Sequence, residues 1–287
     1  MEFHDTSLVL EGGGSRGVFT AGVLDYLLEK KIDISYVVGV SAGSCNAVDY
    51  VAGQAGRTKE CMIVKEKAYR YVSLHSIIHN KSLFDMDMVF DKFPNQYIPF
   101  DYDQYFQSTK KCEIVATNCL TGKPEYFHED SSRSRIMQVC RASSSLPFMG
   151  PMVMLDGVPY LDGGISDSIP LARAFKQGNK KHVVILTRYL DYRKKVDSRE
   201  AVLAKMYERK YPLLAKSIIR RPLVYNRTLD IIEKMERQGQ IFVIRPCKYV
   251  VGRAETNHDK LETFYQHGYD MMKDQFDAML AYLKGEE

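Results

Sequence analysis

Residues 36–43 read Tyr-Val-Val-Gly-Val-Ser-Ala-Gly, and this stretch decides the fold. Its first half is β-branched, as expected of a strand, and small residues follow the serine, as expected of a helix packed closely behind it. Ser41 thus lies at a sharp strand-to-helix turn, where Gly39 and Gly43 relieve crowding and the serine Oγ stays exposed. Ser41 is therefore a candidate nucleophile. The alternative is a chance match to G-x-S-x-G in a strand–loop–helix connection.

Strands and helices alternate on both sides of this turn. Residues 6–10 are apolar and precede a glycine loop, and residues 16–31 carry apolar side chains at helical spacing. This order predicts βαβ units and a largely parallel sheet. Further strands are predicted at 34–40, 112–118, 152–155, 182–187 and 240–245, and helices at 42–51, in most of 57–110, in 189–239 and, as one helix, at 260–283. No internal repeat or low-complexity linker interrupts the order, so we expect one domain.

Composition excludes several classes of protein. A net charge of +4 on 287 residues, without a Lys/Arg tract, gives no reason to expect a nucleic-acid partner. No apolar run approaches the length of about 20 residues that spans a bilayer, and the N-terminus does not resemble a signal peptide. The six cysteines show neither C-x-x-C pairs nor metal-ligand spacing. We expect a soluble, cytoplasmic, enzyme-sized domain with reduced thiols, no metal and no cofactor.

The segment Gly12-Gly13-Gly14-Ser15-Arg16-Gly17 lies between the first predicted strand and its helix. It also fits a dinucleotide fingerprint, which needs an acidic residue at the end of the second strand, where Val40 and Ser41 stand instead. The other use of such a loop is an oxyanion hole, because its amides direct free N–H groups at a developing negative charge. The expected donors are the amides of Gly13, Gly14 and Ala42. Three roles stay open for Arg16: it could fix the loop, contact a substrate phosphate or form a first-turn salt bridge.

A nucleophilic serine needs a base, and the three histidines late in the chain are the first candidates. His182 opens an apolar strand, while His258 and His267 lie in polar helical sequence, so each is expected to be structural. Asp162 is the better candidate, because Tyr160-Leu161-Asp162-Gly163-Gly164 ends a short strand at a glycine turn that presents a carboxylate to a cleft. An aspartate is a weak base, so a dyad requires this carboxylate to be desolvated or tightly oriented. The alternative is an ordinary β-turn aspartate.

In order and spacing, segments 12–17, 39–43 and 162–164 resemble the motifs of the patatin-like phospholipase family, as does Arg141-Ala142-Ser143-Ser144-Ser145-Leu146-Pro147. The resemblance covers residues 6–190 and implies a three-layer α/β fold with a mixed, mostly parallel central sheet flanked by helices. It also implies Ser41 as nucleophile, Asp162 as base and the glycine loop as oxyanion hole. Residues 191–287 are then expected to form a helical cap or C-terminal extension packed on the same domain.

The segment 189–239 is helical in pattern, basic, and interrupted by Pro212 and Pro222. A basic amphipathic stretch can lie on an anionic membrane surface. A cap packed on the sheet, with its basic side chains in solvent, is favoured over that interpretation. The basic groups concerned are Arg193-Lys194-Lys195, Arg209-Lys210 and Arg220-Arg221.

Together these features predict a serine esterase that acts on acyl lipids, of phospholipase A or lysophospholipase type, through an acyl-enzyme. The expected partners are an acyl-lipid substrate and a peripheral membrane surface, with no nucleic acid. Two alternatives stay open on the same fold. One is a non-catalytic lipid- or partner-binding protein, and the other is a transacylase.

Overall fold

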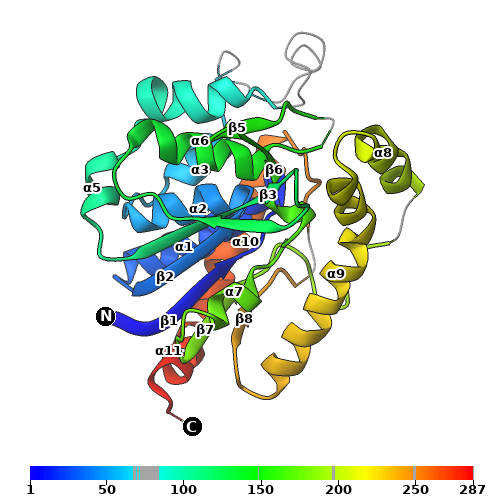
Figure 1. The fold of residues 1–287 in the computed structure, drawn as a ribbon. Coiled ribbons are helices and arrows are strands. Elements are labelled where there is room, and N and C mark those ends of the chain that lie inside the picture. The colour runs from blue at the N-terminus through cyan, green and yellow to red at the C-terminus, as the bar shows by residue number, and fades with distance from the viewer. Residues whose placement is uncertain are drawn as a thin grey trace.

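The computed structural model describes residues 1–66, 69, 71, 84–147, 149–195, 198–247 and 250–286. In this part of the chain eight strands form one sheet in the order β5-β6-β3-β2-β1-β7-β8, with β4 paired to β3 (Figure 1). The strands are β1 (Glu2–Leu10), β2 (Asp33–Val40), β3 (Lys111–Asn118), β4 (Pro124–Phe127), β5 (Val153–Leu155), β6 (Val158–Asp162), β7 (Lys181–Ile185) and β8 (Phe242–Ile244).

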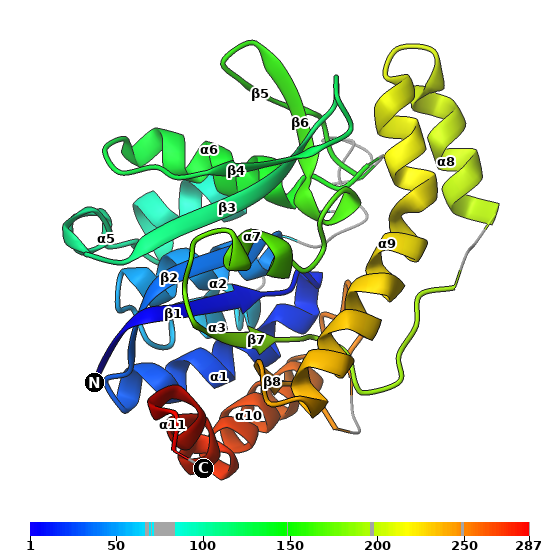
Figure 2. The ribbon, with the colours of Figure 1, turned by 60° about the horizontal axis from the view of Figure 1, so that its bottom comes forward.

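Helices cover both faces of the sheet (Figure 2). They are α1 (Gly17–Glu29), α2 (Ala42–Val51), α3 (Arg57–Met62), α5 (Tyr102–Gln107), α6 (Arg133–Ser144), α7 (Leu171–Phe175), α8 (Ser198–Glu208), α9 (Pro212–Arg237), α10 (His258–Asp274) and α11 (Phe276–Lys284). Successive strand residues point to opposite faces. Leu8 and Leu10 therefore pack with α1, α2 and α10, whereas Val9 packs with α7 and α9. The expected three-layer α/β arrangement is confirmed.

The sheet is mixed and mostly parallel, as predicted. Strands β3, β2, β1, β7 and β8 pair in parallel, whereas β4 and β6 run antiparallel to β3, and β5 runs antiparallel to β6. The pairing of β4 was not predicted. Its four residues are all only half-buried and include Pro124 and Glu125, so no apolar alternation marks it.

Two expectations about the C-terminal part were wrong. Residues 260–283 are not one helix, because α10 ends before Gln275 and α11 starts after it. Pro212 opens α9, a favourable place for proline, but Pro222 does not interrupt this helix. Pro222 lies in the buried stripe that includes Ile218 and Tyr225. Packing of that stripe offsets the local cost of a proline inside a helix, about 3 kcal/mol.

The region 57–110 is helical only in part. It contains α3, a π-helical segment at Met88–Tyr97 and α5, while residues 67, 68, 70 and 72–83 lie outside the described residues. Phe93, at the centre of the π-helical segment, is fully buried and packs edge-on against Tyr71. Phe93 thus belongs to a small separate core with Tyr69 and Tyr71, whereas most of the other aromatic side chains described in this region pack in the main core.

Helix α10 packs on α1 through glycines on both helices. A Cβ on Gly268 would lie 2.0 Å from the Phe19 carbonyl oxygen, and one on Gly22 would lie 2.1 Å from the Tyr265 carbonyl oxygen. Contact this close ties the end of the chain to the first helix of the sheet domain (Figure 2). None of the helices in the described residues combines the length and the apolar composition needed to cross a membrane.

Replacing Gly268 with alanine is expected to lower the free energy of unfolding by about 1–3 kcal/mol, because overpacking against backbone outweighs the gain in helix propensity. Gly252→Ala is the matched control, since a Cβ there would meet nothing within 4 Å. Urea denaturation followed by circular dichroism measures both variants. Equal stability of the two would contradict close packing of α10 on α1.

Candidate active site

Strand β3 brings Ser41 and Asp162 together. In the register, Val40 of β2 lies opposite Val115, and Asp162 of β6 lies opposite Ala116. At both Val115 and Ala116, β3 also pairs with β4. Since a strand has only two edges, β2 and β6 lie along the edge of β3 that faces away from β4. Because β2 is parallel and β6 antiparallel to β3, their C-terminal ends meet head-on there. Ser41 and Asp162 thus lie at neighbouring positions although they are 121 residues apart in sequence.

Ser41 lies in a strained turn. Its φ and ψ are 55° and −123°, a conformation that costs a non-glycine residue about 1–3 kcal/mol. The helix behind it approaches closely, since a Cβ on Gly39 would lie 2.3 Å from the Gly43 carbonyl oxygen. A Cβ on Gly43 would in turn lie 2.5 Å from the Leu10 carbonyl oxygen. The two glycines therefore allow the turn that leaves Ser41 half-buried at the N-terminus of α2.

The end of α6 fixes both residues. Ser143 Oγ accepts a hydrogen bond from the Ser41 amide at 2.8 Å and donates one to the Val115 carbonyl at 2.6 Å. Two residues later, the Ser145 carbonyl accepts from the Asp162 amide at 2.8 Å. The segment 141–147 thus holds the positions of Ser41 and Asp162 relative to each other.

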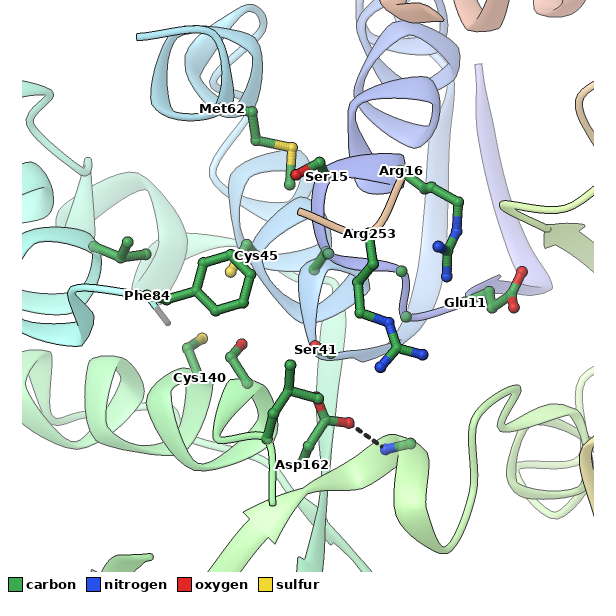
Figure 3. A pocket seen from close by; sticks show the side chains of 18 of the residues that line it. Glu11, Ser15, Arg16, Ser41, Cys45, Met62, Phe84, Cys140, Asp162 and Arg253 are labelled. Carbon is green, nitrogen blue, oxygen red and sulfur yellow. Dashed lines mark hydrogen bonds between the residues drawn. The ribbon is translucent and has the colours of Figure 1, made fainter. Parts of the chain in front are cut away.

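Asp162 is 2% exposed, and its Oδ1 accepts from the Gly164 amide at 2.7 Å. Asp162 and Ser41 line the same cavity, with Asp162 below Ser41 in Figure 3. In the structure the two side chains do not hydrogen-bond each other; Ser41 Oγ points into the cavity that a substrate would fill. Catalytic hydrogen bonds are often long without substrate and tighten only in the complex. The carboxylate is nonetheless desolvated and oriented, as a base of this kind requires.

The glycine loop borders the same cavity. Gly12, Gly13, Gly14, Ser15 and Arg16 all line it, as does Ala42. We find no hydrogen bond from the amides of Gly13, Gly14 or Ala42 to another group of the described residues. The segment after β8 holds the loop, because the Arg253 carbonyl accepts from the Ser15 amide at 2.8 Å. Gly14 has φ 59°, and a Cβ there would lie 2.4 Å from that carbonyl oxygen.

Two further glycines of the motifs, Gly17 and Gly163, support the site from outside the cavity. A Cβ on Gly17 would lie 2.7 Å from Ala42 Cβ, so this glycine lets α1 approach the N-terminus of α2. A Cβ on Gly163 would lie 2.2 Å from the Val115 carbonyl oxygen, so this one lets the turn after Asp162 fold onto β3. Gly164 does line the cavity.

None of the three late histidines is among the described residues that line the cavity. His182 is 1% exposed, its ring lies 4.0 Å from the Phe175 ring, and burial lowers its pKa to about 4. His267 packs against Phe19, and burial lowers its pKa as well. Their places match the structural roles expected from sequence.

One wall of the cavity is apolar. Figure 3 shows Phe84, Cys45 and Cys140 together on one side of Ser41. The side chains that make up this apolar wall are Cys45, Val48, Met62, Phe84, Met86, Val89, Phe90, Met137, Cys140 and Leu146. Arg57 and Asp49 also reach it, but they form a closed ion pair at 2.8 Å.

The opposite wall is basic. Figure 3 shows Arg253 and Arg16 on the other side of Ser41, with Glu11 behind them. We call this the cationic wall, and its members are Arg16, Arg188, Lys194, Arg221 and Arg253. The sequence points to Arg16, Lys194 and Arg221 but not as one group, and it does not point to Arg188 or Arg253. No local motif marks these two, because only the fold gathers residues so far apart in sequence.

Burial, together with the crowding of like charges, lowers the pKa values of Arg16 and Lys194 in the cationic wall. Desolvation, followed by repulsion from Arg188, lowers the pKa of Arg16 to about 10. Desolvation, followed by repulsion from Arg221 and Arg253, lowers the pKa of Lys194 to about 6. Arg16 forms no ion pair within the described residues, so the salt-bridge interpretation of this arginine was wrong.

The basic stretch 193–221 is not a uniform solvated face, which corrects that expectation. Arg193 pairs with Asp230 and Glu233 of α9, while Lys194 and Arg221 point to the cavity. Lys195 and Arg220, next to them in sequence, are exposed. The favoured cap interpretation holds for the fold of this segment, although part of its charge serves the cavity.

A family model described as patatin-like phospholipase matches residues 8–175, more than half of the chain. The chain belongs to this family. A second model, described as a domain of unknown function, matches residues 211–284.

Two relatives and one solved structure are similar to much of the chain. An uncharacterized protein of Escherichia coli, YjjU, is 31% identical over 84% of this chain and 68% of its own length. A probable lipid hydrolase, 463L, of Invertebrate iridescent virus 6 is 25% identical over 61% of this chain and 65% of its own. The structure of VipD from Legionella pneumophila shares the fold, with a TM-score of 0.54 at 14% identity over 96% of this chain and 67% of that one. The chain thus spans about two thirds of the length of each of these three proteins.

Replacing Ser143 with alanine is expected to lower the free energy of unfolding by about 1–3 kcal/mol, because it leaves the buried Ser41 amide and Val115 carbonyl without their partner. Ser134→Ala, at the exposed start of the same helix, is the control and should change it by less than about 0.5 kcal/mol. Urea denaturation measures both. A loss no larger for Ser143→Ala than for the control would show that this serine does not hold the turn.

Proposed function

We propose that the protein is a serine lipid acyl hydrolase of phospholipase A or lysophospholipase type, with Ser41 as nucleophile and Asp162 as base. The observation that carries the proposal is the meeting of these two residues beside β3, at a cavity with one apolar wall. Family membership supports it, as does the relative named a probable lipid hydrolase.

The proposed reaction proceeds through an acyl-enzyme. Ser41 Oγ attacks the ester carbonyl carbon while Asp162 takes the hydroxyl proton, and the alcohol leaves with that proton. The amides of Gly13, Gly14 and Ala42 stabilise the oxyanion, helped by the N-terminal end of the α2 dipole. Water then attacks the acyl-enzyme, with Asp162 again as base, and releases the fatty acid.

The apolar wall is the place for the acyl chain. It begins at Ser41 and continues with Cys45 and Val48 of α2, which lie one and two turns further along the helix. A chain whose carbonyl carbon sits at Ser41 would bury its methylenes there, at about 0.8 kcal/mol for each. This term favours long acyl esters over short ones.

Two alternatives on the same fold are a non-catalytic binding protein and a transacylase. The strained φ of Ser41 weighs against the first, because a binding protein gains nothing from a serine held at that cost. A transacylase would pass the acyl group from Ser41 to an alcohol acceptor in place of water. Product analysis with and without glycerol separates it from a hydrolase.

We also propose one domain, in which residues 6–190 form the catalytic core and residues 191–287 a helical cap and C-terminal extension. The pairing of β8 with β7 supports this division, because it adds the later segment to the edge of the same sheet. The packing of α10 on α1 supports it as well.

Ser41→Ala is expected to lower kcat/KM for a long-chain ester by about 10³-fold or more and to abolish labelling by a fluorophosphonate, because the attacking oxygen is gone. Asp162→Asn should lower kcat by about 10²–10⁴-fold, because an amide cannot accept the proton. Hydrolysis of p-nitrophenyl esters measures both.

The control is single replacement of His182, His258 or His267 with glutamine, which should retain most of the activity. A large loss of kcat in any one of them would favour a histidine base. Labelling that persists in Ser41→Ala would exclude Ser41 as nucleophile.

We further propose that the hairpin of α8 and α9 contacts the membrane surface that carries the substrate. Figures 1 and 2 both place α8 on the outer side of α9, away from the sheet. Met206, Leu223 and Val202 are 69%, 63% and 62% exposed. The same hairpin exposes basic side chains, a combination that binds anionic lipid surfaces. Its exposed basic residues include Lys205, Arg209, Lys210, Lys216 and Arg220.

The double variant Met206→Glu, Leu223→Glu is expected to bind vesicles of phosphatidylglycerol and phosphatidylcholine about tenfold more weakly, because two apolar anchors become charged. Vesicle sedimentation measures the affinity, and added salt should weaken wild-type binding by screening. Met154→Glu, on β5 and 58% exposed in the wild type, is the control. Equal binding by both variants would make the hairpin a structural cap only.

A further inference from the structure

An ester has an acyl part and an alcohol part, and the apolar wall is the proposed site for the acyl part only. If the acyl chain extends from Ser41 along α2, the alcohol part of the substrate must leave toward the opposite side of the cavity. That side is the cationic wall (Figure 3). Neither the chemistry at Ser41 nor the burial of an acyl chain needs this concentration of positive charge.

The charged ends of the cationic wall lack partners. In the described residues no hydrogen bond or ion pair engages the side-chain nitrogens of Arg188, Lys194, Arg221 or Arg253. The Nε atoms of Arg16 and Arg221 are buried without a partner. By contrast, the pocket arginine Arg57 bonds to Asp49 and to two backbone carbonyls. A buried guanidinium usually has such partners, so these donors, unengaged among the described residues, are available to an anionic ligand.

Tyrosine rings hold these cations without neutralising them. Lys194 Nζ lies 4.2 Å from the centre of the Tyr225 ring, and the Arg188 guanidinium lies 4.3 Å from that of Tyr192. A cation–π contact restricts the side chain while leaving its N–H donors available. Arg221 Nη2 lies beside Gly164, close to Asp162, so the cationic wall reaches the reacting ester.

The nearby carboxylates of the described residues do not balance the charge. Three of them, Glu11, Asp162 and Glu200, act on the five basic side chains. Glu11 is engaged by other donors, because it accepts from the Thr187 amide, the Thr187 hydroxyl and the Tyr225 hydroxyl. Among these groups an excess of one positive charge remains while Lys194 is neutral, and an excess of two when Lys194 is protonated, as a bound anion favours. A phosphomonoester carries about −1.5 to −2 charges near pH 7 and would balance it.

We propose that the cationic wall binds a phosphomonoester on the alcohol side of the scissile ester, so that the substrate is an acyl glycerol phosphate. This inference rests on the proposed hydrolase function and adds the head group to it. Planar guanidinium groups suit phosphate oxygens, and their converging charges favour a dianion. A phosphocholine head group fits less well, because its ammonium group would face the same positive charges.

Four of the five residues of the cationic wall lie outside the segment that matches the family model. Arg188 and Lys194 follow this segment, 8–175, and Arg221 and Arg253 belong to the segment 211–284. The segment 8–175 thus contains Ser41, Asp162 and Arg16, while the later part of the chain supplies the other cations that would select the alcohol.

The test compares three esters with one oleoyl chain: lysophosphatidic acid, lysophosphatidylcholine and monooleoylglycerol. Wild type is expected to show a kcat/KM at least about tenfold higher for lysophosphatidic acid than for either of the others. Replacing Lys194, Arg221 or Arg253 singly with glutamine should lower that ratio by about tenfold. The loss should appear mainly in KM, because the phosphate is bound before and during the reaction.

The chain offers matched controls for the same change of charge. Lys195→Gln alters the exposed neighbour of Lys194, and Arg133→Gln alters an exposed arginine of α6 that does not line the cavity; both should keep the wild-type ratio. A wild-type ratio near one, or an equal fall of the ratio in the controls, would overturn the phosphate assignment and leave the proposed hydrolase intact. Thermal unfolding of each variant verifies its fold, and three independent variants keep the test valid if one is unstable.

Binding to Ser41→Ala separates recognition from turnover. Calorimetry should show that lysophosphatidic acid binds about tenfold more tightly than monooleoylglycerol. If this difference is found but wild type hydrolyses neither ester, only the proposed reaction is rejected. Inorganic phosphate, titrated in the same way, should bind far more weakly than the lipid. Equal affinity for the two lipids, or inorganic phosphate as tight as lysophosphatidic acid, would overturn the head-group assignment.

Discussion

The site depends on one constraint, the pairing of β2 and β6 along a single edge of β3. Two strands of opposite direction end against each other there, opposite Val115 and Ala116. Hydrogen-bond register in a sheet is fixed to a single residue by the buried pattern. The distance between the proposed nucleophile and the proposed base is therefore set by the sheet itself rather than by two loops, and the end of α6 secures it through Ser143 and Ser145.

That rigidity explains where strain and close packing occur. The strained Ser41 conformation persists because its neighbours over-determine it. Gly39 and Gly43 leave no room for a side chain, and the Ser41 amide and carbonyl are both bonded, the latter to Ser44 Oγ at 2.6 Å. The serine side chain alone is left without a structural task, as a group reserved for chemistry would be.

How much of this the sequence predicts depends on how local each signal is. The turn at Ser41, the glycine loop and the Asp162 turn are contiguous motifs, so sequence located the candidate site and the central strands. The break at Gln275 and the unbroken helix at Pro222 were missed, because tertiary packing decides both. The cationic wall was missed as a unit, since Arg16 lies 172 residues before Arg188 and the other members extend to Arg253. These residues become neighbours only when the C-terminal segment folds back on the cavity.

This folding back also links the two parts of the chain chemically. The Arg253 carbonyl positions the glycine loop through the Ser15 amide, and the side chain of the same residue faces the cavity. The loop lies directly against this segment, because Gly14 packs on that carbonyl. Arg253 thus holds the loop whose amides are proposed to stabilise the oxyanion, and its side chain is one of the cations proposed to bind the head group. Acyl transfer and choice of alcohol are, on this basis, properties of one packed unit and not of a core with an appended segment.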